Sequence, residues 1–175
     1  MRGWLAVVCR AHVERGVEGG FAQVCHGKQA PLQRMEAGDW LVYYSPGVTM
    51  RGGERLQAFT ALGQIADDRV YRHDMGGGFV PFRRNVRYQT VRPVPLAELR
   101  DRLHLTARAG WGVSLRRGHL PLDAHDFGLI VAAMGHQALP GGRPGKGRAA
   151  ASAHLQPGCA SRPDWTSVAA AWWYG

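Results

Sequence analysis

The 175-residue sequence predicts an α+β domain, in which a curved and mainly antiparallel sheet of five to six strands is flanked by short helices. Short runs of β-branched and aromatic residues are separated by turns that contain glycine, proline and aspartate, which is typical of antiparallel strands. Stretches with helical spacing of apolar residues are few and short. The hydrophobic share of 45% and the charged share of 20% are those of a globular domain, which excludes a fully disordered chain.

The first part of the chain contains two predicted strands with a helix between them. Residues 4–8 form an apolar run that fits a buried strand. Residues 11–18 suit a short helix, and the two glycines after it supply the positive φ values with which helices commonly end. Residues 40–44 are large β-formers after a Gly-Asp turn, and we expect the Ser-Pro-Gly sequence that follows to stop this second strand.

Three more strands are predicted in the middle of the chain. Residues 57–66 form the third strand, which we expect to end at a turn made by Asp67-Asp68. Residues 70–73 and 79–89 form the fourth and fifth strands, joined by a hairpin loop that contains three consecutive glycines.

Helical signals dominate the region after the fifth strand. Leu96, Leu99 and Leu103 recur at helical spacing. A clearer helix is predicted within residues 122–134, where Asp123 can serve as the N-cap. Together these elements give the small sheet with flanking helices.

Composition divides the chain into a domain, residues 1–135, and a Gly/Pro/Ala/Arg-rich tail, residues 136–175, which we expect to be flexible. The tail holds four basic residues and one acidic residue, so that +6 of the net charge of +9 belongs to the domain. Near the tail's end, the sequence Trp172-Trp173-Tyr174 either docks on a hydrophobic surface or is an extension without function.

The sequence predicts a cytoplasmic protein that does not enter a membrane. No window approaches 18 consecutive apolar residues, and the apolar run near the N-terminus is too short for a secretory signal. Cys9, Cys25 and Cys159 are an odd number of cysteines without CxxC spacing, which indicates neither a disulfide framework nor a zinc motif.

No catalytic or cofactor motif is evident. Cys25 and His26 are adjacent, but neighbouring side chains on a strand point to opposite faces, so adjacency is weak support for a nucleophile with its base. The eight histidines are scattered without metal-ligand spacing, and no glycine-rich phosphate loop occurs. We therefore expect no catalysis, no metal and no cofactor.

Basic residues interleaved with aromatic ones indicate a nucleic-acid partner. Arginines lie beside Phe82 and Tyr88, and two more follow Trp111. Cationic side chains neutralise phosphates, and aromatic faces stack on single-stranded or extruded bases. The alternative is that most of these aromatics form the core and that the arginines form a solvated face.

Several motifs resemble the bacterial EVE domain family. They are GGFAQVCHGK at 19–28, GDW-x-x-YYSP at 38–46, QAFTALG at 57–63 and RRG at 116–118. The resemblance covers residues 1–135, and the tail has no counterpart in it. It implies membership of the PUA-like superfamily, close to YTH domains. A pseudo-barrel of β-strands is then expected, with an aromatic pocket that accepts a modified base, such as a methylated one, in DNA or RNA.

On this resemblance we assign expected roles to thirteen residues. The aromatic pocket wall is expected to contain Trp4, Phe21, Tyr44, Phe79 and Trp111, its polar rim His26, Lys28 and Ser45, and the phosphate contacts Arg83, Arg84, Arg87, Arg116 and Arg117. Hydrogen bonds to the base edge are expected from backbone groups near the rim serine or from polar side chains such as Gln23, His26 and Asn85.

Three classes of function remain open from the sequence. The first is a non-catalytic binding module for modified bases, which could serve as a protein partner in a restriction or RNA-modification system. The second is an enzyme or enzyme accessory acting on a nucleobase or small molecule, for which His26 with Asp39 or Cys25 would have to gather at the pocket. The third is a protein-interaction domain.

Overall fold

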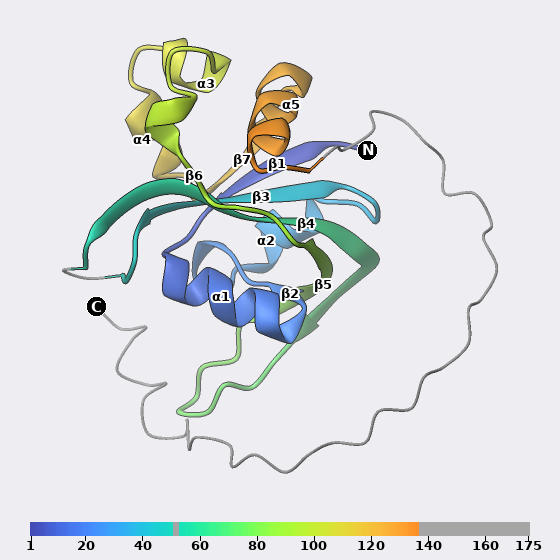
Figure 1. Ribbon diagram of the computed structural model, residues 1–175. Helices are drawn as coiled ribbons and strands as arrows, with labels where there is room; N and C mark the ends of the chain where they lie inside the picture. Colours follow the sequence, from blue (N-terminus) through green and yellow to red (C-terminus); the bar gives the residue numbers. More distant parts are fainter. Residues whose placement is uncertain (51–52, 137–175) are drawn as a thin grey trace, which may run out of the picture.

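The computed structural model describes residues 1–50 and 53–136 (Figure 1). The predicted tail, apart from its first residue, lies outside the described residues, as does the Trp172-Trp173-Tyr174 sequence. None of the described helices is long and apolar enough to cross a membrane.

One curved sheet of seven strands organises the described residues (Figure 1). Its strands are β1 (Gly3–Val7), β2 (Phe21–Ala22), β3 (Trp40–Gly47), β4 (Arg55–Arg72), β5 (Phe82–Gln89), β6 (Val94–Pro95) and β7 (His119–Leu122). The order is β2-β5-β4-β3-β1-β7, and β6 pairs with β4. All pairs are antiparallel except β1 with β3. The α+β class and the mainly antiparallel sheet are confirmed; β2 and β6, with two residues each, are too short to show an apolar alternation.

Short helices connect the strands. They are α1 (Arg10–Gly19), α2 (Gln29–Gln33), α3 (His104–Ala107), α4 (Trp111–Leu115) and α5 (Ala124–Ala133), with 3-10 turns η1 (Cys25–Gly27) and η2 (Leu96–Glu98). The end of α1 is confirmed, because Gly20 has a φ of +67° and its N–H bonds to the last turn. The start of α5 is also confirmed, because the carboxylate of Asp123 accepts the backbone N–H of Asp126.

Two predicted strand ends and one predicted helical stretch are wrong. Strand β3 continues through its Ser-Pro-Gly end, since Pro46 falls at a register shift where no ladder N–H is needed. Strand β4 continues past Asp67-Asp68, where an irregularity between Ile65 and Val70 shifts the pairing with β5 and replaces the expected turn. The leucines at 96, 99 and 103 are buried, but the chain there forms η2 and turns in place of a regular helix.

The sheet separates two apolar clusters, because side chains alternate between its faces. Leu5 of β1 packs with α4 and α5 in one cluster, whereas Trp4 and Ala6 pack with α1 and α2 in the other. We call these sides the α5 face and the α1 face; Figure 1 shows α3, α4 and α5 above the sheet and α1 and α2 below it. This division decides which of the expected site residues can meet.

Candidate nucleic-acid interface

The segment between β2 and α2 has an unusual backbone. Cys25 and His26 have φ values of +49° and +58°, which residues other than glycine rarely adopt. Gly27 follows with a φ of +74°, and a Cβ atom there would lie 2.3 Å from the Cβ atom of Pro81. The segment is therefore pressed against the connection between β4 and β5, a contact that requires glycine. Strained backbone of this kind persists where the surrounding structure fixes it, often at binding sites.

A flat cation covers one aromatic ring beside this segment. The guanidinium carbon of Arg83 lies 3.7 Å from the centroid of the Phe21 ring. The two residues belong to the adjacent strands β5 and β2. Arg83 is 8% exposed, and burial lowers its pKa, partly offset by Tyr71. The Arg83 guanidinium, a planar cation, is thus stacked on the face of the Phe21 ring and largely shielded from solvent.

Gln23 presents an unsatisfied donor next to this stack. Its side chain is 2% exposed, and its Oε1 atom accepts a hydrogen bond of 3.0 Å from Nε of Arg83. Its Nε2 atom has no hydrogen-bond partner among the described residues. A buried amide donor of this kind is costly unless something accepts from it.

His12 of α1 completes the cluster. Its imidazole hydrogen-bonds to the backbone of Gln23, and burial, reinforced by Arg15 and Arg83, lowers its pKa to about 4. The ring is therefore neutral near pH 7. We call His12, Phe21, Gln23 and Arg83 the Phe21 site.

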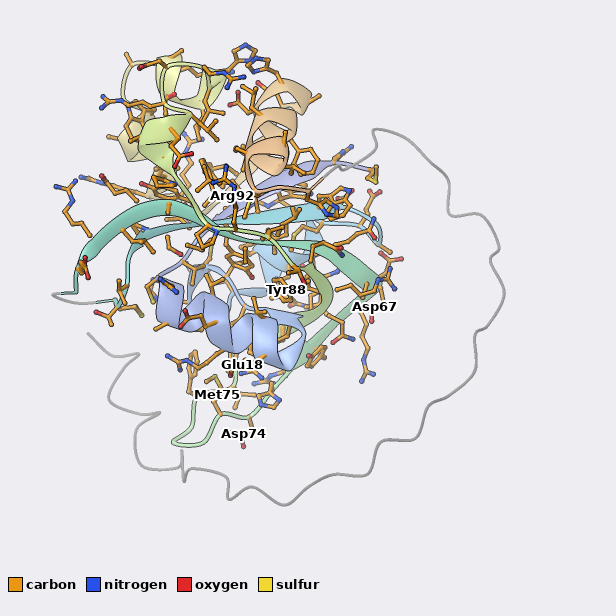
Figure 2. The ribbon with its side chains drawn as sticks, viewed as in Figure 1. Glu18, Asp67, Asp74, Met75, Tyr88 and Arg92 are labelled. Atoms are coloured by element: carbon orange, nitrogen blue, oxygen red, sulfur yellow. The ribbon has the colours of Figure 1, made fainter. Side chains whose placement is uncertain are left out.

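The hairpin between β4 and β5 extends along the α1 face. Figure 2 shows Asp74 and Met75 at its tip, on the same side of the sheet as Glu18 of α1. Phe79, on the returning arm, is half-buried, and its ring would lie 3.6 Å from a Cβ atom at Gly27. Phe79 therefore borders the strained segment next to the Phe21 site.

Exposed cations lie along the other side of the strained segment. The thiol of Cys25 donates to the backbone oxygen of Arg117 at 3.6 Å, which places the segment before β7 next to η1. Arg34 donates from Nη2 to Nδ1 of His119 at 3.1 Å. Arg34 and Lys28 both act electrostatically on the thiol. We call Lys28, Arg34 and Arg117 the basic rim.

The expected single aromatic wall of five residues is wrong. Trp4 is 5% exposed, donates from Nε1 to Asp39 Oδ2 at 2.9 Å and stacks on His119, so it is part of the core. Tyr44 packs against Phe59, and Trp111 starts α4; both belong to the cluster of the α5 face. The sheet therefore lies between these two residues and Phe21.

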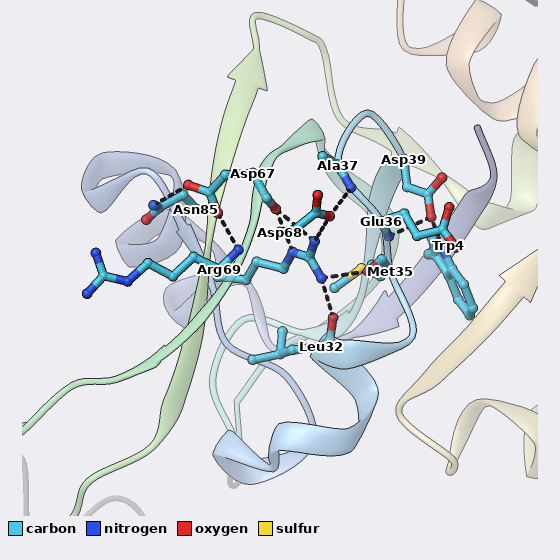
Figure 3. Close-up of polar contacts among 11 residues, drawn as sticks. Trp4, Leu32, Met35, Glu36, Ala37, Asp39, Asp67, Asp68, Arg69 and Asn85 are labelled. Carbon is cyan, nitrogen blue, oxygen red and sulfur yellow. Dashed lines mark hydrogen bonds and ion pairs between the residues drawn. The ribbon is translucent and has the colours of Figure 1, made fainter.

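Two polar residues also have internal roles. Ser45 is fully buried and its hydroxyl pairs with that of Thr60 at 2.8 Å, so it does not line a rim. Arg84 is 2% exposed, and its guanidinium donates to the backbone oxygens of Leu32, Met35 and Asp67 and to the carboxylate of Asp68 (Figure 3). This guanidinium ties α2 and the loop after it to β4, which excludes the expected phosphate contact in this structure.

The remaining expected residues are accessible. His26, Lys28, Arg87, Arg116 and Arg117 are exposed. Asn85, considered for the base edge, donates instead to Asp67 Oδ2 at 2.8 Å. Sequence reasoning missed His12 and Arg34, since a histidine on a helix and an arginine in a polar loop carry no motif.

The contacts of Cys25 and Asp39 do not favour an enzyme. Burial raises the pKa of the Cys25 thiol despite the nearby cations, which is the opposite of an activated nucleophile. The carboxylate of Asp39 accepts the backbone N–H of Glu36 and the indole N–H of Trp4 (Figure 3). It also accepts the backbone N–H of Arg2. These hydrogen bonds join β1 to the turn before β3, which is a structural role.

A hollow lies elsewhere, between α1 and strands β4 and β5. It measures about 470 Å³ and is lined by Val17, Thr60, Val86, Tyr88 and Val91, among others. None of the thirteen expected site residues lines it. The Phe21 ring face, by contrast, is covered by Arg83 in this structure.

Known proteins share both the sequence and the fold. A sequence model of the EVE domain family matches residues 2–133. A UPF0310 protein of Streptococcus sanguinis (strain SK36) is 50% identical over 131 residues, 74% of this chain and 90% of the relative. One of Streptococcus mutans serotype c (strain ATCC 700610 / UA159) is 46% identical over 132 residues, 75% of this chain and 95% of the relative.

Among solved structures, the chain is similar to the YTH domain of a Zygosaccharomyces rouxii protein in complex with N6-methyladenosine RNA. The TM-score is 0.53 at 13% identity, covering 82% of this chain and 90% of that one. At this identity the likeness concerns the fold, and it agrees with the relationship that the motifs imply. The sequence match over three quarters of its length settles the family: the chain belongs to the EVE domain family.

Proposed function

We propose that this chain is a non-catalytic nucleic-acid-binding module that recognises a modified base, in DNA or RNA, at the Phe21 site. One observation carries the proposal: a planar group already lies on the face of Phe21, beside a buried amide donor that has no partner within residues 1–50 and 53–136. A flipped base offers the same flat shape together with acceptor atoms on its edge. The YTH domain that shares this fold was solved with methylated RNA, which supports such a ligand on this scaffold.

The proposed binding event exchanges one planar group for another. The base takes the place of the Arg83 guanidinium on the Phe21 ring, and Nε2 of Gln23 donates to an oxygen or ring nitrogen of the base edge. Stacking of a base on an aromatic side chain contributes about 1–3 kcal/mol. A methyl group on the base adds about 0.8 kcal/mol if it is fully buried, so its recognition depends on close packing.

Displaced Arg83 then becomes a phosphate contact. Its guanidinium is a bidentate donor that suits phosphate oxygens, and it stays next to the site because its backbone belongs to β5. The basic rim supplies further charge around the strained segment. Arg87 and Arg116, both exposed, are proposed as additional phosphate contacts. Such contacts give affinity that falls steeply with salt.

Fluorescence anisotropy tests the proposal with a panel of labelled oligonucleotides. Short single strands and duplexes are compared with and without methylated adenine, methylated cytosine or hydroxymethylated cytosine, at two salt concentrations. The full chain is expected to bind one modified strand more tightly than its unmodified match, with a gain that persists at the higher salt. Equal binding of all strands that disappears with salt would mean that charge alone is responsible.

Two matched variants locate the binding. Phe21→Leu keeps an apolar side chain but removes the ring face, and it is expected to weaken binding of the preferred strand by about ten-fold or more. Trp111→Leu makes the same kind of change on the α5 face. It is expected to leave binding within about two-fold, because the sheet lies between Trp111 and the Phe21 site. The reverse pattern would place the interface on the α5 face.

A further inference from the structure

Two histidines that are far apart in the sequence meet two aspartates on the α5 face. His104 is the first residue of α3, Asp123 precedes α5, and His125 and Asp126 lie in the first turn of α5. One ligand atom from each of the four residues lies within 4.8 Å of the other three. This cluster, which we call the His-Asp cluster, is remote from the Phe21 site and has no part in the proposed function.

Both histidines turn a ring nitrogen toward a carboxylate. Nδ1 of His104 lies 3.0 Å from Oδ2 of Asp123, and Nδ1 of His125 lies 3.1 Å from Oδ1 of Asp126. The two imidazoles are stacked, with ring centroids 4.1 Å apart and planes inclined by 13°. Imidazole nitrogens and carboxylate oxygens are the ligands that zinc binds at about 2.0–2.2 Å.

The carboxylates are held in place by the backbone. Asp126 is 2% exposed and accepts the N–H groups of His104 and Leu105, which begin α3. Oδ1 of Asp123 accepts the N–H of Asp126, while its Oδ2 atom faces the imidazole of His104. Two carboxylates fixed this close repel each other, and a cation between them removes that repulsion. The backbone contacts account for the position of both aspartates but not for the two imidazoles beside them.

The spacing fits a small divalent cation. In a tetrahedral zinc site with bonds of about 2.0–2.1 Å, neighbouring ligand atoms lie about 3.3 Å apart. The two His-to-Asp distances are already close to this value, so only the distances between the two pairs have to shorten. Rotation of the imidazoles would open the stack and shorten these distances. The side chains of His104 and His125 have room for this rotation, because they are 57% and 47% exposed.

We propose that His104, Asp123, His125 and Asp126 bind one zinc ion through two imidazole nitrogens and two carboxylate oxygens. The ion joins the start of α3 to the start of α5, two elements that are also linked by the hydrogen bonds of Asp126. Zinc binding therefore stabilises the folded chain, since the unfolded chain does not hold these ligands together.

The test uses the full, tag-free chain after removal of metal with a chelator. Zinc is titrated by calorimetry, and cobalt, which absorbs visible light strongly in a tetrahedral site, is titrated by spectroscopy. The key variant, His104→Asn with His125→Asn, keeps a hydrogen-bond donor near each Nδ1 position but removes the nitrogen lone pair. His73→Asn, a change at an exposed histidine of the α1 face hairpin, is the matched control.

The proposal expects one equivalent of zinc to bind the wild-type chain and the control alike, with the visible cobalt bands and an increase of several degrees in Tm. In the double variant, affinity falls by at least about ten-fold and the cobalt bands and the increase in Tm disappear. Circular dichroism checks that the variant is folded. Absence of zinc binding to the wild type, or binding that the double variant retains, overturns the proposal.

Discussion

Two buried histidines make the stability of this domain depend on pH. His12 and His119 are 8% and 2% exposed, and burial lowers the pKa of each to about 4, reinforced by Arg15 and Arg83 for His12 and by Arg34 for His119. In the unfolded chain both imidazoles return to their ordinary pKa of about 6.5. Between these values the unfolded state binds more protons than the folded state, so stability falls as the pH falls.

The size of the effect follows from the two pKa values. Relative to pH 7.5, each histidine lowers the free energy of unfolding by about 2 kcal/mol at pH 5, and together they lower it by about 4 kcal/mol. This loss is a large part of the total free energy of unfolding, which is about 5–15 kcal/mol for native proteins. Above pH 5 the carboxylates stay ionised in both states and contribute little to this change.

Urea unfolding, followed by tryptophan fluorescence at several pH values between 7.5 and 5, measures the effect. His119→Phe is the informative variant, because a phenyl ring keeps the stack on Trp4, whose ring centroid lies 4.9 Å from that of His119, but cannot take up a proton. The loss between pH 7.5 and 5 should then shrink from about 4 to about 2 kcal/mol. A wild-type loss below about 1 kcal/mol, or a loss that the variant leaves unchanged, would refute this reasoning.

Three further substitutions test the packing around the site by urea unfolding. Arg84→Met leaves buried carbonyl groups without a donor and is expected to cost about 3–5 kcal/mol; a loss under about 1 kcal/mol would show that α2 does not depend on this guanidinium. Gly27→Ala places a methyl group against Pro81 at a φ of +74° and should lower both stability and affinity for the preferred oligonucleotide, whereas unchanged binding would separate the strained segment from the site. Asp39→Ala removes the acceptor for the Trp4 indole and for two backbone N–H groups, and it is expected to lower the free energy of unfolding by about 3 kcal/mol. Wild-type stability of this variant would contradict the structural role of Asp39.

The sequence predicted the elements that depend on local chemistry. Short runs of apolar and β-forming residues between turns predicted β1, the start of β3 and much of β5, and the glycine end of α1 and the Asp123 cap of α5 followed from their residue types. Elements of two to five residues, such as β2 and α2, were missed because they have too few positions for a period. The continuation of β4 was missed because a register shift places Asp67-Asp68 inside a strand.

The candidate site was predictable in part. The motif around Phe21 and Gln23 marked the correct segment, and Arg83 was recognised as a basic residue beside it. Sequence could not show that Tyr44 points to the α5 face, because alternation along β3 groups it with Trp40 and Val42 but does not tell which side of the sheet α4 and α5 cover. It also could not show that Arg84 is buried and hydrogen-bonded within the fold, since adjacent arginines cannot be distinguished in a sequence until their partners are known.

The most direct test of the central claim is an intermolecular NOE measured by NMR. The wild-type chain is mixed with the tightest-binding modified oligonucleotide, whose methyl group carries ¹³C. The exchange proposed for the Phe21 site predicts NOEs from this methyl group to the ring protons of Phe21, together with loss of the contact between that ring and Arg83. NOEs confined to residues of the α5 face, such as Trp111, with the stack of Arg83 on Phe21 unchanged, would contradict it.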